Sequence, residues 1–379
     1  MINVTRYRVY PAREMQDKIF EQFGVCTTVR DACLDTGNFD VRQLPGLKLT
    51  YPELKSVHSV VLQNMLFQVR DNIKALSKLK SKGKRVGQLR HKKVRTLIYE
   101  QTGYKIVGNK LSLSKIGEMR IEISRPIPGV IKQVILKFTR THQWYVSVIS
   151  RTEDDPSLRD GERTVGIDMN LVNFSTDSDG KVFDHPHNVR TSAKQLGRAQ
   201  RKMSKKVKGS RNRKKQRLRV AKVYETAERR RDDFLHKWSN YYIQNYDKIA
   251  VEKLNIKEML EQQRPDGMTR KTKRGMNRNT LDAAWGKARG FLTYKAERAG
   301  CQVVLVNPAY TTQECYKCGN IVKKGLDERT HDCNVCGYKE PRDLNSALMI
   351  RKKGFNIGWG TPEYTLTEIG TSVSVSAPV

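Results

Sequence analysis

The first 150 residues alternate between two kinds of apolar periodicity. VTRYRVY, close to the N-terminus, alternates apolar and polar residues as a strand does, and Pro11 then opens a helical pattern. A second helical pattern runs from Pro52 to about Lys80 and places its apolar residues on one face, which we expect to pack into a core. From Thr96 to Ser150, short β-branched or aromatic runs are broken by Gly, Asn and Pro. These runs predict an antiparallel β-barrel, with VTRYRVY as a further candidate strand.

The second half of the chain alternates buried strands with helices after a polar linker at 153–162. TVGID, KIAVE and CQVVLV are continuous apolar runs, typical of strands that are covered on both faces. NFSTDSDGKVFDH follows the first strand with the Asp-Gly turn of a hairpin, and a long basic segment, 190–231, comes next. We expect a loop at 262–279, then helices in LDAAWGKARGFLTYKAERAG and RDLNSALMIRKKG. This order of elements is the one expected of a ribonuclease-H-like fold.

The charge of the chain is strongly one-sided. Lys and Arg number 72 against 39 Asp and Glu, which gives a formal net charge of +33, while apolar residues make up 37% of the chain. Such an excess repels itself in a compact fold and indicates a polyanionic partner, for which nucleic acid fits better than an acidic membrane surface. The sequence contains neither an apolar run of about 18 residues nor an apolar signal core at the N-terminus. We therefore expect a soluble, cytoplasmic protein.

Four of the seven cysteines form two Cys-x-x-Cys pairs, Cys315 with Cys318 and Cys333 with Cys336. Two thiolates separated by two residues on a tight turn can reach the same ion, and a glycine after each pair lets the backbone fold over it. Four thiolates in a tetrahedral array suit Zn²⁺. Because protein atoms would fill all four positions, the ion would be structural rather than catalytic.

Two other interpretations of the cysteine region are weaker. One alternative is a pair of disulfides, as in a secreted protein. The odd number of cysteines, seven, does not fit a secreted disulfide framework. His331 lies close to Cys333 and could serve as a ligand, but two Cys pairs already complete the shell, so we expect a solvent-facing polar residue. Cys26, Cys33 and Cys301 lie in helical or strand patterns and are expected to be small buried residues.

Three carboxylates stand where separate elements would bring them together. Asp168 ends the first buried strand, Glu252 ends the second, and Asp343 opens the helix after the cysteines. Carboxylates at the ends of adjacent strands point into a shared cleft, and a helix N-terminus favours an anion. Such oxygen ligands suit Mg²⁺ or Mn²⁺, and two ions can activate a water and stabilise the leaving oxygen in phosphodiester cleavage. Taken singly, an acid here is more often a cap or turn residue, which is how we interpret three others: Asp177, Asp179 and Asp282.

Several stretches of the second half closely resemble the TnpB family, proteins that are encoded by bacterial and archaeal insertion sequences and are related to type V CRISPR nucleases. The resemblance is carried by GIDMN, VEKLN, TLDAAWGKARGFLTYKAERAGCQVVLVNPAYTTQECYKCG and CGYKEPRDLNSALMI, and it covers most of residues 160–355. RYRVYPARE and WYVSV in the first half are similar more weakly. Two places depart from the family pattern: Pro341 stands where the family has Asp, and Met169 to Leu171 lack a glycine often found there.

The resemblance implies an RNA-guided, metal-dependent DNA endonuclease of a transposable element with a RuvC-type centre. Asp168, Glu252 and Asp343 would be its catalytic metal ligands, and the four cysteines would form an inserted zinc ribbon. The implied partners are a guide RNA from the element and a double-stranded DNA target with a short flanking motif, so the protein would associate with the nucleoid when it binds DNA.

The same resemblance implies a multidomain α+β organisation. A discontinuous β-barrel (wedge) domain would occupy 1–10 with 91–155, and a helical recognition domain would occupy 11–90. A RuvC-like nuclease domain with a basic helical insertion at 188–245 would occupy 160–310 with 341–355, and the zinc ribbon would occupy 311–340. The small and polar composition of 356–379 separately predicts a disordered tail.

Basic clusters at 74–95, 190–231 and 264–278 could line a channel for an RNA–DNA heteroduplex, which such a nuclease recognises by its backbone and shape. The individual contacts that we expect within these clusters are Lys84, Arg85, Arg213 and Lys214. Two other functions share the charge and the fold: a non-catalytic nucleic-acid-binding regulator or transposition accessory, and a transposase that joins strands itself without RNA. The presence of all three acids in register favours a nuclease over the regulator.

Overall fold

In the computed structural model of the chain, the described residues are 1–37, 40–153, 156–261, 268–325 and 328–356. The chain divides into two compact units, Met1–Asp155 and Pro156–Val379. The tail predicted at 356–379 lies outside the described residues, apart from Asn356, which ends the last helix. Along the described part of the chain, no helix combines the length and the apolar character needed to span a membrane.

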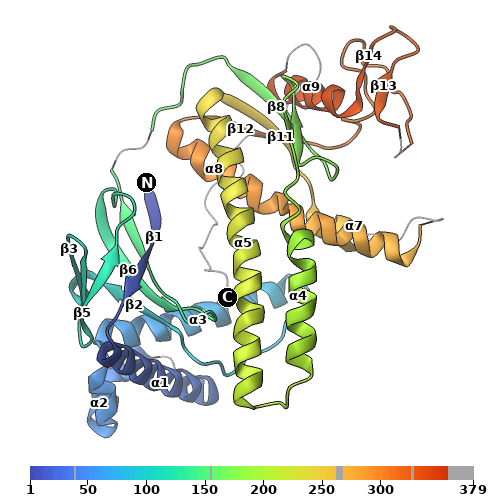
Figure 1. Cartoon of the computed structure of the whole chain (residues 1–379). Helices are drawn as coiled ribbons and strands as arrows, with labels where there is room; N and C mark the ends of the chain where they lie inside the picture. The colour runs from blue at the N-terminus through green and yellow to red at the C-terminus, as the bar shows by residue number, and fades with distance from the viewer. Residues whose placement is uncertain (38–39, 154–155, 262–267, 326–327, 357–379) are drawn as a thin grey trace. The chain divides into compact units, whose positions relative to one another are not determined.

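An antiparallel sheet of seven strands forms the barrel of the first unit (Figure 1). Its strands are β1 (Ile2–Tyr10), β2 (Thr96–Glu100), β3 (Tyr104–Val107), β4 (Lys110–Leu113), β5 (Gly117–Glu122), β6 (Val130–Phe138) and β7 (Trp144–Arg151). Their order is β2-β6-β7-β1-β5-β4-β3, so the N-terminal strand pairs with β5 and β7 in the middle of the sheet. Only three residues join the edge strands β2 and β3, which brings the edges together into a near-closed barrel. The prediction that VTRYRVY adds a strand is confirmed.

The helices of the first unit share one core with the barrel. They are α1 (Arg13–Thr36), α2 (Leu44–Thr50) and α3 (Ser59–Ser81), with the 3-10 turns η1 (Val41–Gln43) and η2 (Pro52–Ser56) between them. Ile19 of α1 and Leu62 of α3 are fully buried and belong to the same cluster as Leu97 and Val148 of the barrel. The apolar face predicted in this region is therefore a core face, although its first turn is a separate 3-10 segment.

The second unit is built on a five-stranded sheet of mixed direction (Figure 1). Its strands are β8 (Thr164–Met169), β9 (Ser175–Asp177), β10 (Val182–Phe183), β11 (Lys248–Glu252) and β12 (Gln302–Val306). The order is β10-β9-β8-β11-β12, in which β8, β11 and β12 are parallel and β9 and β10 form the predicted hairpin. Gly180 in the hairpin turn has φ 83°, a conformation that favours glycine. This is the ribonuclease-H-like arrangement that the sequence predicts.

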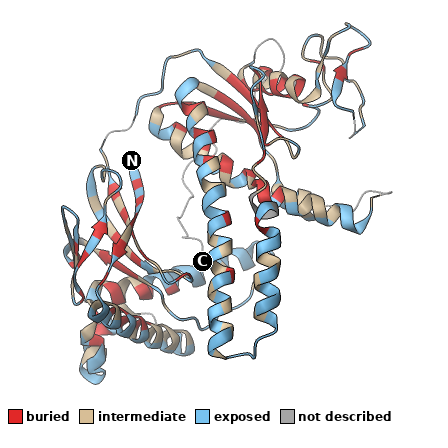
Figure 2. Ribbon diagram, in the orientation of Figure 1, coloured by how far each residue is buried: buried red, intermediate tan, exposed pale blue. Residues whose placement is uncertain are grey.

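The two faces of this sheet are covered by different helices (Figure 2). The covering helices are α5 (Arg211–Asn245), α8 (Trp285–Ala299) and α9 (Arg342–Phe355). Ile167 and Val251 belong to the buried cluster that includes α5 and α8, whereas Ala250 and Val306 pack with Ile350 of α9. Because side chains alternate between faces along a strand, the even-numbered residues of β8 and β11 lie on the α9 side.

Helix α9 approaches the sheet closely at two glycines. A Cβ on Gly166 of β8 would stand 2.2 Å from the carbonyl oxygen of Ala347 in α9. A Cβ on Gly354 of α9 would stand 2.5 Å from the Cβ of Ala250 in β11. Gly166 and Ala250 are neighbours in the parallel register, so two small residues form one shallow trough beneath the helix. The absence of a side chain at Gly166 and Gly354 is what allows α9 to lie on both strands.

The basic segment at 190–231 lies in a helical hairpin of α4 (Asn188–Ser204) and α5, which pack side by side (Figure 1). The guanidinium of Arg213 donates to the carbonyl oxygens of Met203 at 3.1 Å and Lys206 at 2.8 Å, which closes the turn between the helices. Most residues of the described hairpin are exposed or half-buried (Figure 2), as the scarcity of apolar residues predicts.

The prediction of a loop at 262–279 is wrong for residues 270–279. Residues 270–279 belong to α7 (Arg270–Ala283), and residues 262–267 lie outside the described part of the chain. The helix forms despite its Gly and Asn residues because the Thr269 hydroxyl accepts from the N–H of Thr272 and caps its N-terminus. The amide of Asn277 also donates to the preceding short helix, α6 (Ile256–Glu261), at the carbonyl of Leu260.

The single helix expected in LDAAWGKARGFLTYKAERAG is in fact the end of α7 followed by α8. Ala284 adopts a left-handed conformation, with φ 52° and ψ 42°, and this breaks the helix between Ala283 and Trp285. No proline or glycine marks the break, so apolar periodicity alone does not reveal it. Asp282, expected at a helix start, consequently lies near the end of α7 and is buried.

Candidate active site and metal centre

Asp168 and Glu252 lie side by side at the ends of two neighbouring parallel strands. Val251 pairs with Ile167, so the next residue of each strand continues the same register. Neighbouring strands are about 4.8 Å apart, and both carboxylates stand at even-numbered positions, which lie on the sheet face that α9 covers. Asp168 is 5% exposed and Glu252 is 7% exposed. The structure therefore brings together two acids that are separated by a helical hairpin in the sequence.

Asp343 reaches the same region from the first turn of α9 and is half-buried. The Nε of Arg342 lies 3.3 Å from its Oδ1. Burial, followed by the negative charges of Glu252 and Asp343, raises the pKa of Asp168 well above its ordinary value. Both other acids thus lie close enough to act on the charge of Asp168. Within the described residues, the trio is not among the ligand groups that converge to within 4.8 Å, so the acids do not surround a single point as the cysteines do.

Each buried carboxylate accepts a hydrogen bond from a hydroxyl. Ser346 Oγ donates to Asp168 Oδ1 at 3.1 Å, and Asn170 Nδ2 lies 3.4 Å from the other oxygen, Oδ2. Thr311 Oγ1 donates to Glu252 Oε1 at 2.7 Å. Burial raises the pKa of Glu252 to about 7, although the Thr311 hydrogen bond and the charge of a nearby lysine act in the opposite direction. A cation beside these groups would favour their ionised forms.

These hydrogen-bonding residues were not predicted from the sequence. Ser346 lies one helical turn after Asp343, so a helical wheel centred on that acid would have marked it. Thr311 lies in the loop after β12, where nothing local in the sequence relates it to Glu252, 59 residues earlier. Asn170 could have been suspected only from its position just after Asp168.

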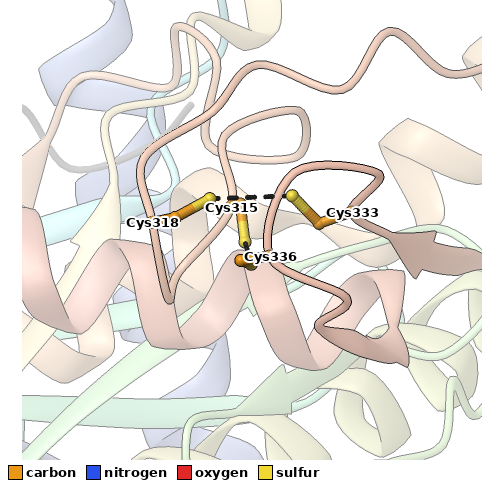
Figure 3. Close-up of side chains that lie close together, drawn as sticks. All are labelled: Cys315, Cys318, Cys333 and Cys336. Atoms are coloured by element: carbon orange, nitrogen blue, oxygen red, sulfur yellow. Dashed lines mark hydrogen bonds between the residues drawn. The ribbon is translucent and has the colours of Figure 1, made fainter.

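The four predicted cysteine ligands meet in a small ribbon between β12 and α9. One sulfur from each of Cys315, Cys318, Cys333 and Cys336 lies within 4.8 Å of the others. The Sγ atoms of Cys315 and Cys336 are 3.7 Å apart, and those of Cys318 and Cys333 are 3.6 Å apart (Figure 3). All four thiols are free, which contradicts the alternative of two disulfides. The group is a four-cysteine metal centre.

Both halves of the ribbon use the same backbone turn. The N–H of Gly319 donates to the carbonyl of Cys315 at 2.8 Å, and that of Gly337 donates to Cys333 at 2.9 Å. Both glycines have positive φ, 78° and 68°, as expected for residues that fold the backbone over an ion. Backbone N–H groups, that of Cys336 above all, point at the Cys333 sulfur and lower its pKa to about 6, which favours the thiolate that binds metal.

The prediction that His331 faces solvent is wrong. Its side chain is fully buried within the two-stranded ladder of β13 (Thr330–Asp332) and β14 (Lys339–Pro341). Its Nδ1 contacts the Nζ of Lys324, and its ring packs near that of Tyr338. His331 is nevertheless outside the ligand group, so its contribution is to the interior of the ribbon. The expectations for Cys26 and Cys301 hold, since both are buried, whereas Cys33 is half-buried.

A second group of possible ligands, His185, His187 and Asp282, also converges to within 4.8 Å among the described residues. The two imidazole rings are stacked, with centroids 4.3 Å apart and planes inclined by 10°. A metal ion lies close to the plane of each imidazole that binds it, and two nearly parallel planes share no such position. The backbone N–H of His187 also donates to His185 Nδ1 at 2.9 Å. The two rings are therefore not arranged to bind one ion together, and Asp282 lies near the end of α7 rather than at the helix start that the sequence predicts.

The four basic residues expected to contact nucleic acid differ in their surroundings. Lys84, Arg85 and Lys214 are exposed, and their positions leave them accessible to a polyanion. Arg213 is half-buried, and its guanidinium makes the two hydrogen bonds that close the α4–α5 turn. A nucleic-acid role for these residues stays a prediction.

Comparison with known proteins finds two family models that match the second half of the chain. Residues 147–263 match the OrfB_IS605 family, described as "Probable transposase", and residues 285–350 match the "Cas12f1-like, TNB domain". The "Putative RNA-guided DNA endonuclease InsQ" of Escherichia coli K12 is 33% identical over 251 residues, which are 65% of this chain and 62% of that protein. Over these residues the chain is similar to the OrfB_IS605 (TnpB) family. The first of these family matches contains Asp168 and Glu252, and the second contains Asp343 and the four cysteines.

Two further relatives extend the TnpB likeness over most of the chain. The "Putative RNA-guided DNA endonuclease" of Streptomyces pristinaespiralis is 27% identical over 370 residues, which are 92% of this chain and 88% of that protein. The protein chain in the "Cryo-EM structure of the Cas12f1-sgRNA-target DNA complex" superposes with a TM-score of 0.55 at 10% identity, over 93% of this chain and 98% of that one. At that identity, the likeness concerns the fold alone.

Proposed function

We propose that this TnpB-like chain is an RNA-guided DNA endonuclease of an insertion element, with Asp168, Glu252 and Asp343 as its catalytic carboxylates. The observation that carries the proposal is the pair of buried acids on adjoining parallel strands, with the third acid delivered by α9. Desolvated, mutually repelling carboxylates are costly in a fold unless they bind something positive. The names of the InsQ and Streptomyces relatives support the substrate class and the use of RNA.

The donor set fits hard divalent cations. Carboxylate oxygens are the ligands that Mg²⁺ and Mn²⁺ prefer, and Asp168, Glu252 and Asp343 would hold such ions. Bound cations of this kind activate water and stabilise the leaving oxygen in phosphodiester cleavage, giving a 5′-phosphate and a 3′-hydroxyl. The chain's own part is to hold the carboxylates in place: Ser346 orients Asp168, Thr311 orients Glu252, and the α9 backbone fixes Asp343.

We assign Zn²⁺ to the four-cysteine centre. Sulfurs about 2.3 Å from a tetrahedral zinc ion stand about 3.8 Å from one another. The Sγ separations of 3.6 Å between Cys318 and Cys333 and 3.7 Å between Cys315 and Cys336 fit that requirement. With four protein ligands, the ion would serve folding of the ribbon rather than the reaction.

The positive charge of the chain fits the remaining partners. A net charge of +33 suits a protein that holds a guide RNA and a DNA target along their phosphates, while base pairing supplies the sequence specificity. The exposed lysines and arginines of the α4–α5 hairpin are the best candidates for part of this surface.

Replacement of Asp168 tests the proposed site. Asp168→Asn keeps the shape and one acceptor oxygen but removes the charge, so we expect DNA cleavage to fall by at least about 10³-fold in the presence of Mg²⁺. Binding of RNA and DNA, measured by gel shift or fluorescence anisotropy, should stay within about twofold. Asp184→Asn, an exposed acid in the same unit, is the matched control and should cleave like the parent. Cleavage by Asp168→Asn at the parent's rate would show that the chemistry takes place elsewhere.

A further inference from the structure

Two hydroxyl residues flank the cysteine ribbon, and each holds one of the buried carboxylates. Thr311, four residues before Cys315, donates to Glu252 at 2.7 Å, and Ser346, ten residues after Cys336, donates to Asp168 at 3.1 Å. Both side chains are buried, with exposures of 1% for Thr311 and 0% for Ser346. The chain therefore enters and leaves the ribbon at residues that contact the acids.

The loop that carries Thr311 is held in a specific conformation. Tyr310 has φ 63°, a left-handed conformation that costs a tyrosine about 1–2 kcal/mol. The carbonyl oxygen of Tyr310 accepts from the N–H groups of Gln313 and Glu314 at 3.0 and 2.9 Å. Ala309, which precedes Tyr310, donates its N–H to the side chain of Asn307. Strained residues of this kind persist where the surrounding structure needs their geometry. Here the geometry places the Thr311 hydroxyl on Glu252.

The end of the same loop is attached to α9. Asn345 is fully buried; its Nδ2 donates to the carbonyl of Glu314 at 2.9 Å, and its Oδ1 accepts from the N–H of Tyr316 at 3.0 Å. The Nζ of Lys353 pairs with the Glu314 carboxylate at 2.6 Å, and the Nζ of Lys352 donates to the carbonyl of Tyr316 at 3.1 Å. Residues 314–316, which lead into the first cysteine turn, are thus fixed to the helix that carries Asp343.

We propose that Thr311 and Asn345 are positioning residues that couple the folded ribbon to the carboxylates: Asn345 fixes the ribbon entrance on α9, and Thr311 then holds Glu252 in the orientation that binds cations. This inference rests on the carboxylate site of the proposed function and adds its dependence on the ribbon. Glu252 needs such a contact because a buried carboxylate beside Asp168 is pushed toward other rotamers by repulsion. Loss of a residue that orients a metal ligand typically weakens metal binding about 10–100-fold.

Mn²⁺ binding to the zinc-loaded, nucleic-acid-free protein, measured by electron paramagnetic resonance, tests the coupling without relying on activity. Only the Mn²⁺ binding that is lost in the Asp168→Asn variant counts as binding to the carboxylate site. Thr311→Val is isosteric and should weaken this binding about 10–100-fold, whereas Thr311→Ser keeps the hydroxyl and should restore it to within about threefold. Thr280→Val is the matched control, because that buried hydroxyl bonds a carbonyl of its own helix, and it should bind Mn²⁺ like the parent.

Asn345→Asp tests the connection through the ribbon. The substitution keeps an acceptor for the Tyr316 N–H but removes the donor to Glu314, so Mn²⁺ binding should weaken at least about fivefold while zinc content stays at one per chain. Parental Mn²⁺ affinity in Thr311→Val or in Asn345→Asp would overturn the coupling and leave the proposed nuclease site standing. If Asp168→Asn binds Mn²⁺ as the parent does, the proposed carboxylate site and the coupling are both wrong.

Discussion

Asp168 and Glu252 show what it means for two carboxylates to be buried together. Each is desolvated, each repels the other, and each is compensated by a single hydroxyl donor. Their pKa values are therefore raised by burial, Glu252 to about 7 and Asp168 well above its ordinary value. Removing the charge from such a site stabilises the fold, whereas a divalent cation stabilises the charge. The site is thus suited to binding cations at the expense of stability without them.

That burial predicts a pH dependence of stability. Without added divalent cations, the free energy of unfolding should fall as the pH rises from about 4.5 to about 7. In this range Glu252 is ionised in the unfolded chain but still holds its proton in the folded protein, so the folded state binds more protons and loses stability with rising pH. The loss should be on the order of a few kcal/mol.

Urea denaturation at pH 5 and pH 8 measures this effect. Glu252→Gln should be more stable than the parent at pH 8 and should lose part of the pH dependence, because residue 252 no longer binds a proton while Asp168, whose pKa is also raised, still does. Glu258→Gln, at an exposed acid on α6, should keep the parental slope. Equal slopes for Glu252→Gln and the parent would mean that another group causes the change.

Residues whose role follows from their own chemistry could be identified from the sequence, and residues whose role follows from their partners could not. The cysteine pairs and the strand-terminal acids carry their ligand atoms with them. Thr311 and Asn345 are ordinary polar residues until the fold brings a carboxylate and a carbonyl to them across many residues. His331 was misjudged for the same reason, since the ladder that buries it pairs residues 330–332 with 339–341.

At the scale of elements, the position of α9 decides where the third acid lies. The helix rests in the trough formed by Gly166 and Ala250, and this contact places Asp343 and Ser346 beside the ends of β8 and β11. A larger residue in the trough would lift the helix away from the strands. The glycine in GID therefore helps to position the three carboxylates, although it carries no chemistry of its own.

Gly166→Ala tests this contact. The new Cβ would stand 2.2 Å from the carbonyl oxygen of Ala347, so the helix has to shift, and we expect a loss of about 1–3 kcal/mol in the free energy of unfolding. Hydrogen exchange should also accelerate along α9. Gly290→Ala, in α8 where a Cβ meets open space, should be neutral or stabilising by up to about 1 kcal/mol. Parental stability of Gly166→Ala would show that α9 is not fixed at this point.

The elements themselves were largely predictable, with informative exceptions. The buried strands and the hairpin between β8 and α4 follow from apolar runs and an Asp-Gly turn, which are local signals. The left-handed residue Ala284 and the helix at 270–279 were missed, because a backbone break without Gly or Pro and a cap by Thr269 are decided by packing and hydrogen bonds. Propensity yields to tertiary contacts at these places.

At the scale of the whole molecule, each of the two units has its own buried core, and positive charge is abundant in both. Such a chain repels itself until a polyanion neutralises it. A guide RNA would meet this need permanently, whereas a target DNA would meet it only at the moment of cleavage. We therefore expect the protein to carry RNA throughout its folded lifetime.

The protein purified from its native host should therefore contain stoichiometric RNA, as measured by absorbance ratio and sequencing. Ribonuclease treatment should abolish sequence-specific cleavage, and adding the recovered RNA back should restore it. The Asp168→Asn variant should retain the same RNA, since its surface charge is nearly unchanged. Specific cleavage that survives complete RNA removal would favour the RNA-independent transposase instead.

The connection between Ser346 and Asp168 spans 178 positions of the chain, and it has a consequence for synthesis. A ribosome makes Asp168 first, Glu252 next and Asp343 only after the whole ribbon. Parallel strands and contacts between distant residues form only when both partners have been made. A chain that is still being translated, or one that is terminated early, therefore lacks an assembled centre. Under the proposed function, incomplete copies of the protein would therefore be unable to cut DNA.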